Sequence, residues 1–140
     1  MAEFIAVPLQ TVEANQNILF TDTTVCGSNS IIHRNGSGLV TVRGITNQCR
    51  ARYRVAFGAN IAVPTGGTVG EISVAIETNG EPVSSTIMTV TPAAVEEFFN
   101  VSRVTHIDVP AGCCLQISVG NISTQAIEVE NANLIVERVA

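Results

Sequence analysis

The stretch from residue 49 to residue 57 decides the fold: Cys49-Arg50-Ala51-Arg52-Tyr53-Arg54-Val55-Ala56-Phe57. Apolar side chains take every second position, and arginine takes three of the four positions between them. An alternation with a period of two is typical of a β-strand that buries one face. We therefore expect the apolar face in a core and the arginine face outside it.

Strand patterns continue along the rest of the chain. The segment Thr68–Thr78 ends in Asn79-Gly80, the pair that suits a type I′ hairpin turn because both positions need a positive φ. The chain is then expected to return over Pro82–Val90. Other strands are expected at Ile18–Phe20, Val25–His33, Leu39–Arg43, Arg103–Val109, Cys114–Val119, Ala126–Val129 and Ala132–Val139. About ten short strands with regularly spaced turns predict a sandwich or barrel.

Helical patterns are almost absent from the sequence. The best candidate is Pro92–Phe99, where a proline at the start and two glutamates would suit one or two turns. The 140 residues correspond to one domain, and we expect residues 1–24 to form a docking arm or edge strands beside a domain of residues 25–140.

The composition favours self-association. Apolar residues make up 46% of the chain, aromatic residues only 4% and charged residues only 14%. Most globular chains carry about 25% charged residues, so part of this low-charge surface is expected to be covered, most simply by copies of the same chain.

The charge balance excludes several classes of function. A net charge of −5 argues against nucleic-acid binding, which needs a basic surface. All seven basic residues are arginine, which excludes mechanisms that depend on lysine. No apolar run reaches the length of a membrane span. Residues 1–10 lack the basic start of a secretory signal, so we expect synthesis in the cytoplasm.

The four cysteines are too few for a disulfide scaffold. We expect Cys26, Cys49, Cys113 and Cys114 to be reduced and mostly buried. A bridge between Cys26 and Cys49 is one alternative, and a strained bond between Cys113 and Cys114 is another. On a strand these two neighbours would point to opposite faces.

Three parts of the sequence resemble the TNF/C1q-like jelly-roll family. Residues 52–61 resemble its long core strand, residues 74–83 its Asn-Gly hairpin, and residues 109–119, with Val109-Pro110-Ala111-Gly112, its late strand entered through a glycine turn. The resemblance extends over residues 39–139. It implies a ten-strand antiparallel jelly-roll sandwich that assembles as a homotrimer. Small jelly rolls of this kind also occur in virions and on bacterial and spore surfaces.

The polar residues that stand out are few. Arg50, Arg52 and Arg54 share one strand face, with Arg43 expected on a neighbouring strand. They could be solvated, could pair across a subunit interface with Glu71, Glu77, Glu128 or Glu130, or could bind an anionic ligand such as a glycan or a phosphate. His106 and Asp108 share a face two residues apart, where the carboxylate could orient the imidazole.

The sequence contains no recognisable catalytic or metal motif. The nucleophile elbow, the His-Glu-x-x-His motif and paired Cys-x-x-Cys spacings are absent. A zinc site from Cys26, Cys49, His33 and one of Cys113 and Cys114 would need long, irregular spacings, so we expect no metal and no cofactor. The glycosylation sequons at Asn35, Asn100 and Asn121 are interpreted as chance.

These observations predict a non-enzymatic structural protein that forms a homotrimer. The expected location is a virion, as a phage head decoration or fibre-tip component in contact with other virion proteins. The alternative is an adhesin of a bacterial or spore surface that binds a glycan or protein at Asn35–Gly38 or Pro64–Gly67. A third hypothesis, an enzyme with a site at His106 and Asp108, has no supporting motif.

Overall fold

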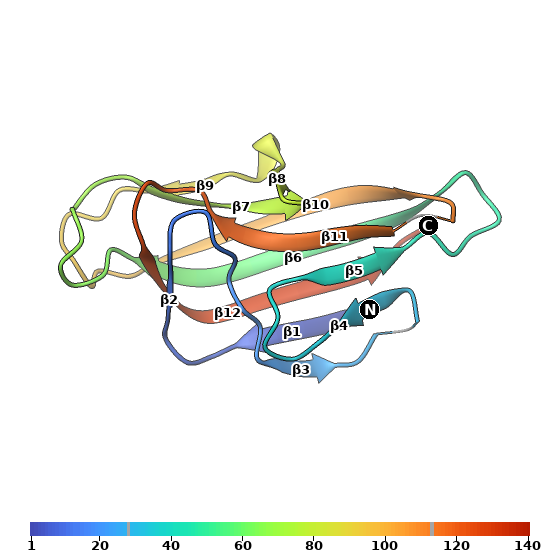
Figure 1. Cartoon of the computed structure of the whole chain (residues 1–140), viewed down its shortest axis with the longest axis horizontal. Helices are drawn as coiled ribbons and strands as arrows, with labels where there is room; N and C mark the ends of the chain where they lie inside the picture. The colour runs from blue at the N-terminus through green and yellow to red at the C-terminus, as the bar shows by residue number, and fades with distance from the viewer. Residues whose placement is uncertain (28, 113) are drawn as a thin grey trace.

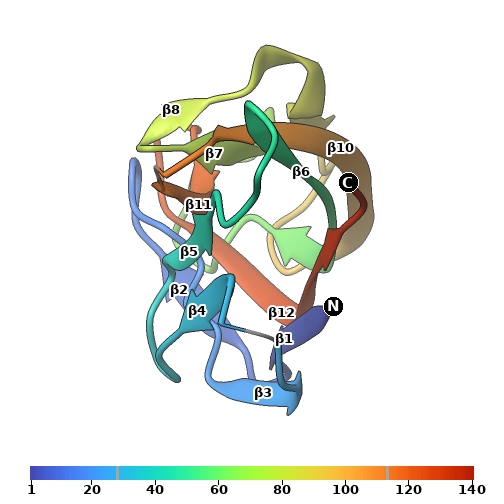
Figure 2. The same ribbon diagram turned by 90° about the vertical axis from the view of Figure 1, so that its right-hand side faces the viewer.

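The computed structural model describes residues 1–27, 29–112 and 114–140, which form two antiparallel β-sheets packed face to face (Figures 1 and 2). Sheet A contains β1 (Ala2–Ala6), β2 (Gln10–Val12), β3 (Asp22–Val25), β6 (Arg50–Ala62), β10 (Phe99–Pro110) and β12 (Ile127–Arg138). Sheet B contains β4 (Ile31–His33), β5 (Val40–Arg43), β7 (Ile72–Thr78), β8 (Glu81–Pro82), β9 (Met88–Val90) and β11 (Cys114–Asn121). A short 3-10 turn, η1, spans Ser84–Thr86. The predicted all-β sandwich is confirmed, and its described residues form twelve strands instead of about ten.

The strand order brings the two ends of the chain together in one sheet. Sheet A runs β10-β6-β12-β1-β3, with β2 also paired to β12. Sheet B runs β4-β5-β11-β7-β8, with β9 also paired to β7. Both chain termini lie toward the same end of the sandwich (Figure 1). No helix in the described part of the chain is long and apolar enough to cross a membrane.

Strand β6 forms the centre of the core, as its alternation predicts. The inward residues of β6 are all buried: Ala51, Tyr53, Val55, Phe57, Ala59 and Ile61. The hydroxyl of Tyr53 donates a 2.7 Å hydrogen bond to the carbonyl of Arg43 on β5. This bond joins the two sheets, so the buried phenol is satisfied and fixes the end of β5 against β6.

Two turns have the backbone that their sequence requires. Asn79 and Gly80 have φ values of 51° and 85°, which confirms the predicted type I′ hairpin between β7 and β8. Asn131 also has a positive φ of 52°, and it lies where the pairing of β12 with β6 shifts register. The two C-terminal strands expected from the sequence are therefore one strand, interrupted by a β-bulge.

Two predicted elements are wrong. Residues 92–98 form turns instead of a helix, because Glu96 has a φ of 60° and its N–H bonds to the carbonyl of Val63, so the helical ladder cannot form. The expected strand Val25–His33 is divided between β3 in sheet A and β4 in sheet B. The chain therefore crosses from one layer to the other within this segment.

The N-terminal residues are part of the sandwich. Strand β1 lies between β12 and β3, and Ala2 pairs with Val136 of β12. Phe4, Ile18 and Phe20 are 2%, 0% and 0% exposed. Side chains on both sides of the expected boundary at residue 24 share one core, and β3 takes an edge position in sheet A.

The cysteines differ from the expectation of buried thiols. Cys26, Cys49 and Cys114 are all exposed, and Cys26 and Cys49 are not bonded to each other. Each lies in or beside a connection at a strand end, where few side chains pack. Cys113 lies outside the described residues, so the expectations for this thiol and for its bond to Cys114 stay predictions.

Candidate functional site

The candidate site is the outward face of sheet A, which we call the outer face. Five of the six residues singled out from the sequence lie at one end of it: Arg50, Arg52 and Arg54 on β6, and His106 and Asp108 on β10. They are brought together because β6 and β10 pair along their whole length, with Arg52 opposite Asp108 and Arg54 opposite His106. The sixth, Arg43, lies on β5 in sheet B, so its expected place on a strand next to β6 is wrong.

Asp108 is the centre of the charged end of this face. Arg52 binds it in a bidentate manner, with Nε 2.7 Å from Oδ1 and Nη2 3.2 Å from Oδ2. Nε of Arg50 lies 3.1 Å from Oδ2. The hydrogen bond from Arg52 is the main reason that the pKa of Asp108 is lowered, and the same contact raises the pKa of Arg52. The carboxylate is therefore held ionised against two guanidinium groups.

His106 is not oriented by Asp108, in contrast to the arrangement considered from the sequence. Both carboxylate oxygens of Asp108 accept bonds from arginines, and the cross-strand neighbour of His106 is Arg54. An open cavity of about 480 Å³ is lined by Arg52, His106, Asp108, Val139 and Ala140. These side chains provide charge and hydrogen-bonding groups without a base–nucleophile pair.

The third arginine has a partner that the sequence analysis missed. Nη1 of Arg54 lies 3.8 Å from Oε2 of Glu137 on β12. Glu137 could have been found from its register, because it lies directly opposite Arg54 on the neighbouring strand. The glutamates considered as partners across a subunit interface lie apart from the arginines within one chain: Glu71 and Glu77 belong to the β7 region of sheet B, and Glu128 and Glu130 lie toward the other end of β12. Their pairing between subunits stays a prediction.

A band of small and apolar side chains crosses the middle of the outer face. Val104, Ala56 and Ile135 are aligned on β10, β6 and β12, with Glu3 of β1 beside Ile135. The next row contains Gly58 and Ile5 together with Ser102 and Asn133. Val104 is 50% exposed. The outward face of an antiparallel sheet is usually polar, so an apolar band between charged ends indicates a surface that another molecule covers.

The opposite end of the outer face contains a pair of carboxyl groups in contact. Glu128 on β12 is only 7% exposed, and its neighbour is Glu96 in the loop after β9. Burial, and then the contact with Glu96, raises the pKa of Glu128. The hydrogen bond from Glu128, followed by a 2.8 Å bond from the Thr65 hydroxyl, lowers the pKa of Glu96. Burial and the contact between the two carboxyl groups therefore favour protonation of Glu128 over protonation of Glu96.

Metal ligands do not gather on the described part of the chain: no group of three or more His, Cys, Asp or Glu side chains there could hold an ion. The alternative zinc site required Cys26, Cys49 and His33 to meet, and these residues form no such group. Its remaining ligand was to be Cys113 or Cys114, and Cys113 lies outside the described residues.

Comparison with known proteins identifies the fold. No protein-family model and no curated protein matches the sequence. Among solved structures, TNF (Eiger) from S. frugiperda is similar with a TM-score of 0.70 and 11% identity, over 99% of this chain and 91% of that one. The globular domain of zebrafish complement 1qA is similar with a TM-score of 0.59 and 9% identity, over 96% and 94%.

This chain therefore has the TNF/C1q-like jelly-roll fold, as the resemblance in its sequence implied. The similarity extends over nearly the whole chain, including the segment before residue 39 that the sequence resemblance did not reach. At these levels of identity the likeness concerns the fold, so the function has to be argued from the outer face.

Proposed function

We propose that the chain is a non-enzymatic structural protein that assembles as a homotrimer through the outer face of sheet A. The observation that carries this proposal is the apolar band of Val104, Ala56 and Ile135, flanked by internally paired charges. Interfaces combine an apolar centre with a polar rim, and this face has that arrangement. Folds of the TNF/C1q-like type commonly form trimers, which supports the order of the assembly.

The charged end supports an interface instead of a catalytic centre. Arg50 and Arg52 share the single carboxylate of Asp108, and Arg54 lies beside Glu137, so two carboxylates offset most of the charge of the three arginines when a second subunit approaches. Paired charges at a rim set orientation and register more than affinity. Native mass spectrometry tests the assembly: a trimer as the dominant species supports the proposal, and monomers or dimers alone oppose it.

The biological setting that we propose is a virion, in which the trimer is a head decoration or a fibre-tip component. The low charge of the chain and the absence of a catalytic motif support a structural role. Density-gradient fractionation of a producing culture tests the setting. A virion component sediments with particles after lysis, whereas recovery only with cell or spore envelopes would favour the alternative.

The alternative is an adhesin or ligand-binding module of a bacterial or spore surface. The observation in its favour is an open cavity of about 710 Å³ whose lining includes Asn35, the start of a loop expected to bind a ligand. Its size is within the range of small-ligand sites. Saturable binding on a glycan array would favour this function, and an array without hits would weigh against it.

A further inference from the structure

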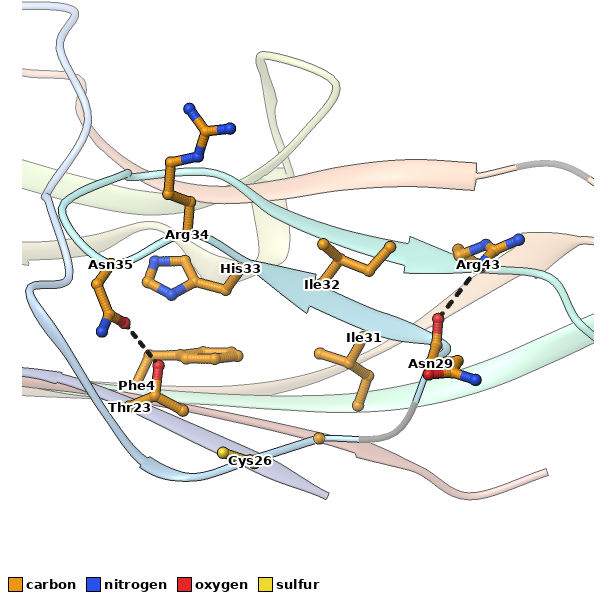
Figure 3. Close-up of a pocket in the computed structure, with 11 residues that line it drawn as sticks. Phe4, Thr23, Cys26, Asn29, Ile31, Ile32, His33, Arg34, Asn35 and Arg43 are labelled. Carbon is orange, nitrogen blue, oxygen red and sulfur yellow. Dashed lines mark hydrogen bonds between the residues drawn. The ribbon is translucent and has the colours of Figure 1, made fainter.

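The cavity at Asn35 lies along the edge of a strand. Its lining includes four consecutive residues, Ile31, Ile32, His33 and Arg34, of which the first three form β4. Consecutive residues of a strand point alternately to its two faces. A cavity that contacts all four therefore runs beside the strand and reaches both of its faces (Figure 3).

Strand β4 ends its sheet and has backbone groups available for pairing. Among the described strands β4 pairs with β5 alone, and β3 ends sheet A on the other side of the cavity. The N–H of Arg43 donates to the carbonyl of Ser30, which places that residue pair in the hydrogen-bonded positions of the ladder. Because these positions alternate, Ile32 faces β5, and the N–H and C=O groups of Ile31 and His33 face the cavity.

The inner wall of the cavity is apolar and includes one unsatisfied acceptor. Phe4 and Ile31 are 2% and 6% exposed, and the rings of Phe4 and His33 lie 4.4 Å apart. Nε2 of His33 lies 2.9 Å from the carbonyl of Ser37, so in the neutral ring this nitrogen carries the proton. Nδ1 of His33 is then a buried acceptor, with no partner among the described residues.

The charge of the cavity is opposite to that of the chain. The net charge is −5, yet the described lining contains Arg34 and Arg43 and no aspartate or glutamate. Figure 3 shows the two arginines toward opposite ends of β4, with Ile32 between them. Both arginines are exposed, so their guanidinium groups are accessible to a negatively charged occupant.

We propose that the free edge of β4 binds an extended acidic segment of a partner protein, which adds a strand to sheet B. Its backbone pairs with Ile31 and His33, as in other strand-addition complexes. Its inward side chains are small and apolar, because they face the wall of Phe4 and Ile31, which leaves little open surface. Its outward side chains lie beside Ile32 and carry carboxylates toward Arg34 and Arg43. This surface lies between β3 and β4, away from the outer face of sheet A.

The test uses a fluorescein-labelled peptide with the pattern Asp-Val-Thr-Val-Asp and a matched peptide with lysine at both ends. Fluorescence anisotropy should show saturable binding of the acidic peptide alone. Arg34→Glu and Arg43→Glu should each weaken binding by at least about tenfold, the effect of losing one charge-assisted contact. Arg103→Glu, the same change on β10, should leave binding unchanged. Circular dichroism confirms that each variant is folded.

Backbone pairing is tested by N-methylation of alternate amides of the acidic peptide, in two complementary sets. One set faces β4 and should abolish binding, and the other faces away and should preserve it. The proposal is overturned by three results: no saturable binding of the acidic peptide, equal binding of the lysine peptide, or equal effects of the two methylation sets.

Discussion

The carboxylate of Asp108 on β10 accepts two hydrogen bonds from the guanidinium of Arg52 on β6, of 2.7 Å and 3.2 Å. Arg50 approaches the same carboxylate, so a single aspartate offsets part of the charge of two cations on the outer face. The proposed trimer contains three copies of this charged end. The negative charge of Asp108 therefore also reduces repulsion between arginines of different subunits, an effect that is absent in an isolated chain.

Replacement of Asp108 by asparagine should therefore weaken assembly at low salt and have little effect at high salt. The side chains of Arg52 and Asp108 are 39% and 43% exposed, so the fold itself should be almost unchanged. Sedimentation velocity at roughly 0.02 M and 0.5 M NaCl, on either side of strong screening, measures the effect. Asp22→Asn on β3 is the matched control. An assembly equally stable at both salt concentrations would contradict this role of Asp108.

The carboxyl pair of Glu96 and Glu128 should make stability depend on pH. Because the pKa of Glu128 is raised in the folded state, its contribution is complete below its unfolded pKa and is lost as the pH rises through the folded value. The pKa of Glu96 is lowered, so Glu96 stays ionised in this range. The groups that face the pair are Thr65 and the carboxylate of Glu130, and neither supplies a positive charge.

Glu128→Gln should thus stabilise the protein increasingly as the pH rises through the folded pKa of Glu128, because the amide keeps a donor toward Glu96 without ionising. A gain on the order of 1 kcal/mol would raise the melting temperature by about 4 °C at pH 8. Differential scanning calorimetry from pH 5 to pH 8 measures this difference against wild type, with Glu130→Gln as the control. A melting-temperature difference that is constant with pH would show that the pKa of Glu128 is not raised in the folded protein.

Phe20 should be essential for the stability of the fold, although it belongs to the segment that the sequence predicts as a docking arm or edge strands. Its side chain is fully buried, and Phe20→Ala should lower the free energy of unfolding by about 3–5 kcal/mol. Deletion of residues 1–24 should leave no cooperative unfolding transition in urea. Leu19→Ala, at an adjacent side chain that is 48% exposed, is the control. A folded deletion product would restore the idea of a separable arm.

Cys26 and Cys49 should react with a maleimide in the native protein as fast as an exposed model thiol. Both side chains are exposed, and reactivity requires access to the thiolate. Intact-mass spectrometry of Cys26→Ser and Cys49→Ser identifies which thiol is modified. Labelling that requires denaturant would show that these thiols are covered in the assembled protein.

The local features of the fold could be predicted from the sequence. The alternation of residues 49–57 places Tyr53 inside and Arg52 outside without any knowledge of other strands. Asn79-Gly80 likewise specifies its own turn, because the positive φ values are a local requirement. These signals depend on neighbours in the sequence, so a single chain is enough to read them.

The partners across the sheets could not be predicted in the same way. Ala2 pairs with Val136, and Arg43 lies in the other sheet from Arg52, although it is only nine positions away. Strand order depends on which connections cross between layers, and the expected strand over residues 25–33 concealed one such crossing. The candidate site was therefore found on β6 and β10, whereas Glu137 and the apolar band required the register of β12.

We expect assembly to bury Val104 more than any other residue of the apolar band, because its side chain is 50% exposed in the middle of that band. Val104→Glu should keep the fold and prevent assembly, since three buried carboxylates would meet or lie near one another. Val69→Glu is the matched control, because Val69 is 46% exposed in the loop before β7. Circular dichroism verifies that both variants are folded.

The central measurement is the solution mass by light scattering, with and without reductant, for wild type, Val104→Glu and Val69→Glu. The account predicts three times the 14.7 kDa chain mass for wild type and Val69→Glu, one chain mass for Val104→Glu, and no effect of reductant. A stable monomer of the wild type, or a trimer that survives Val104→Glu, would contradict assembly through the outer face of sheet A.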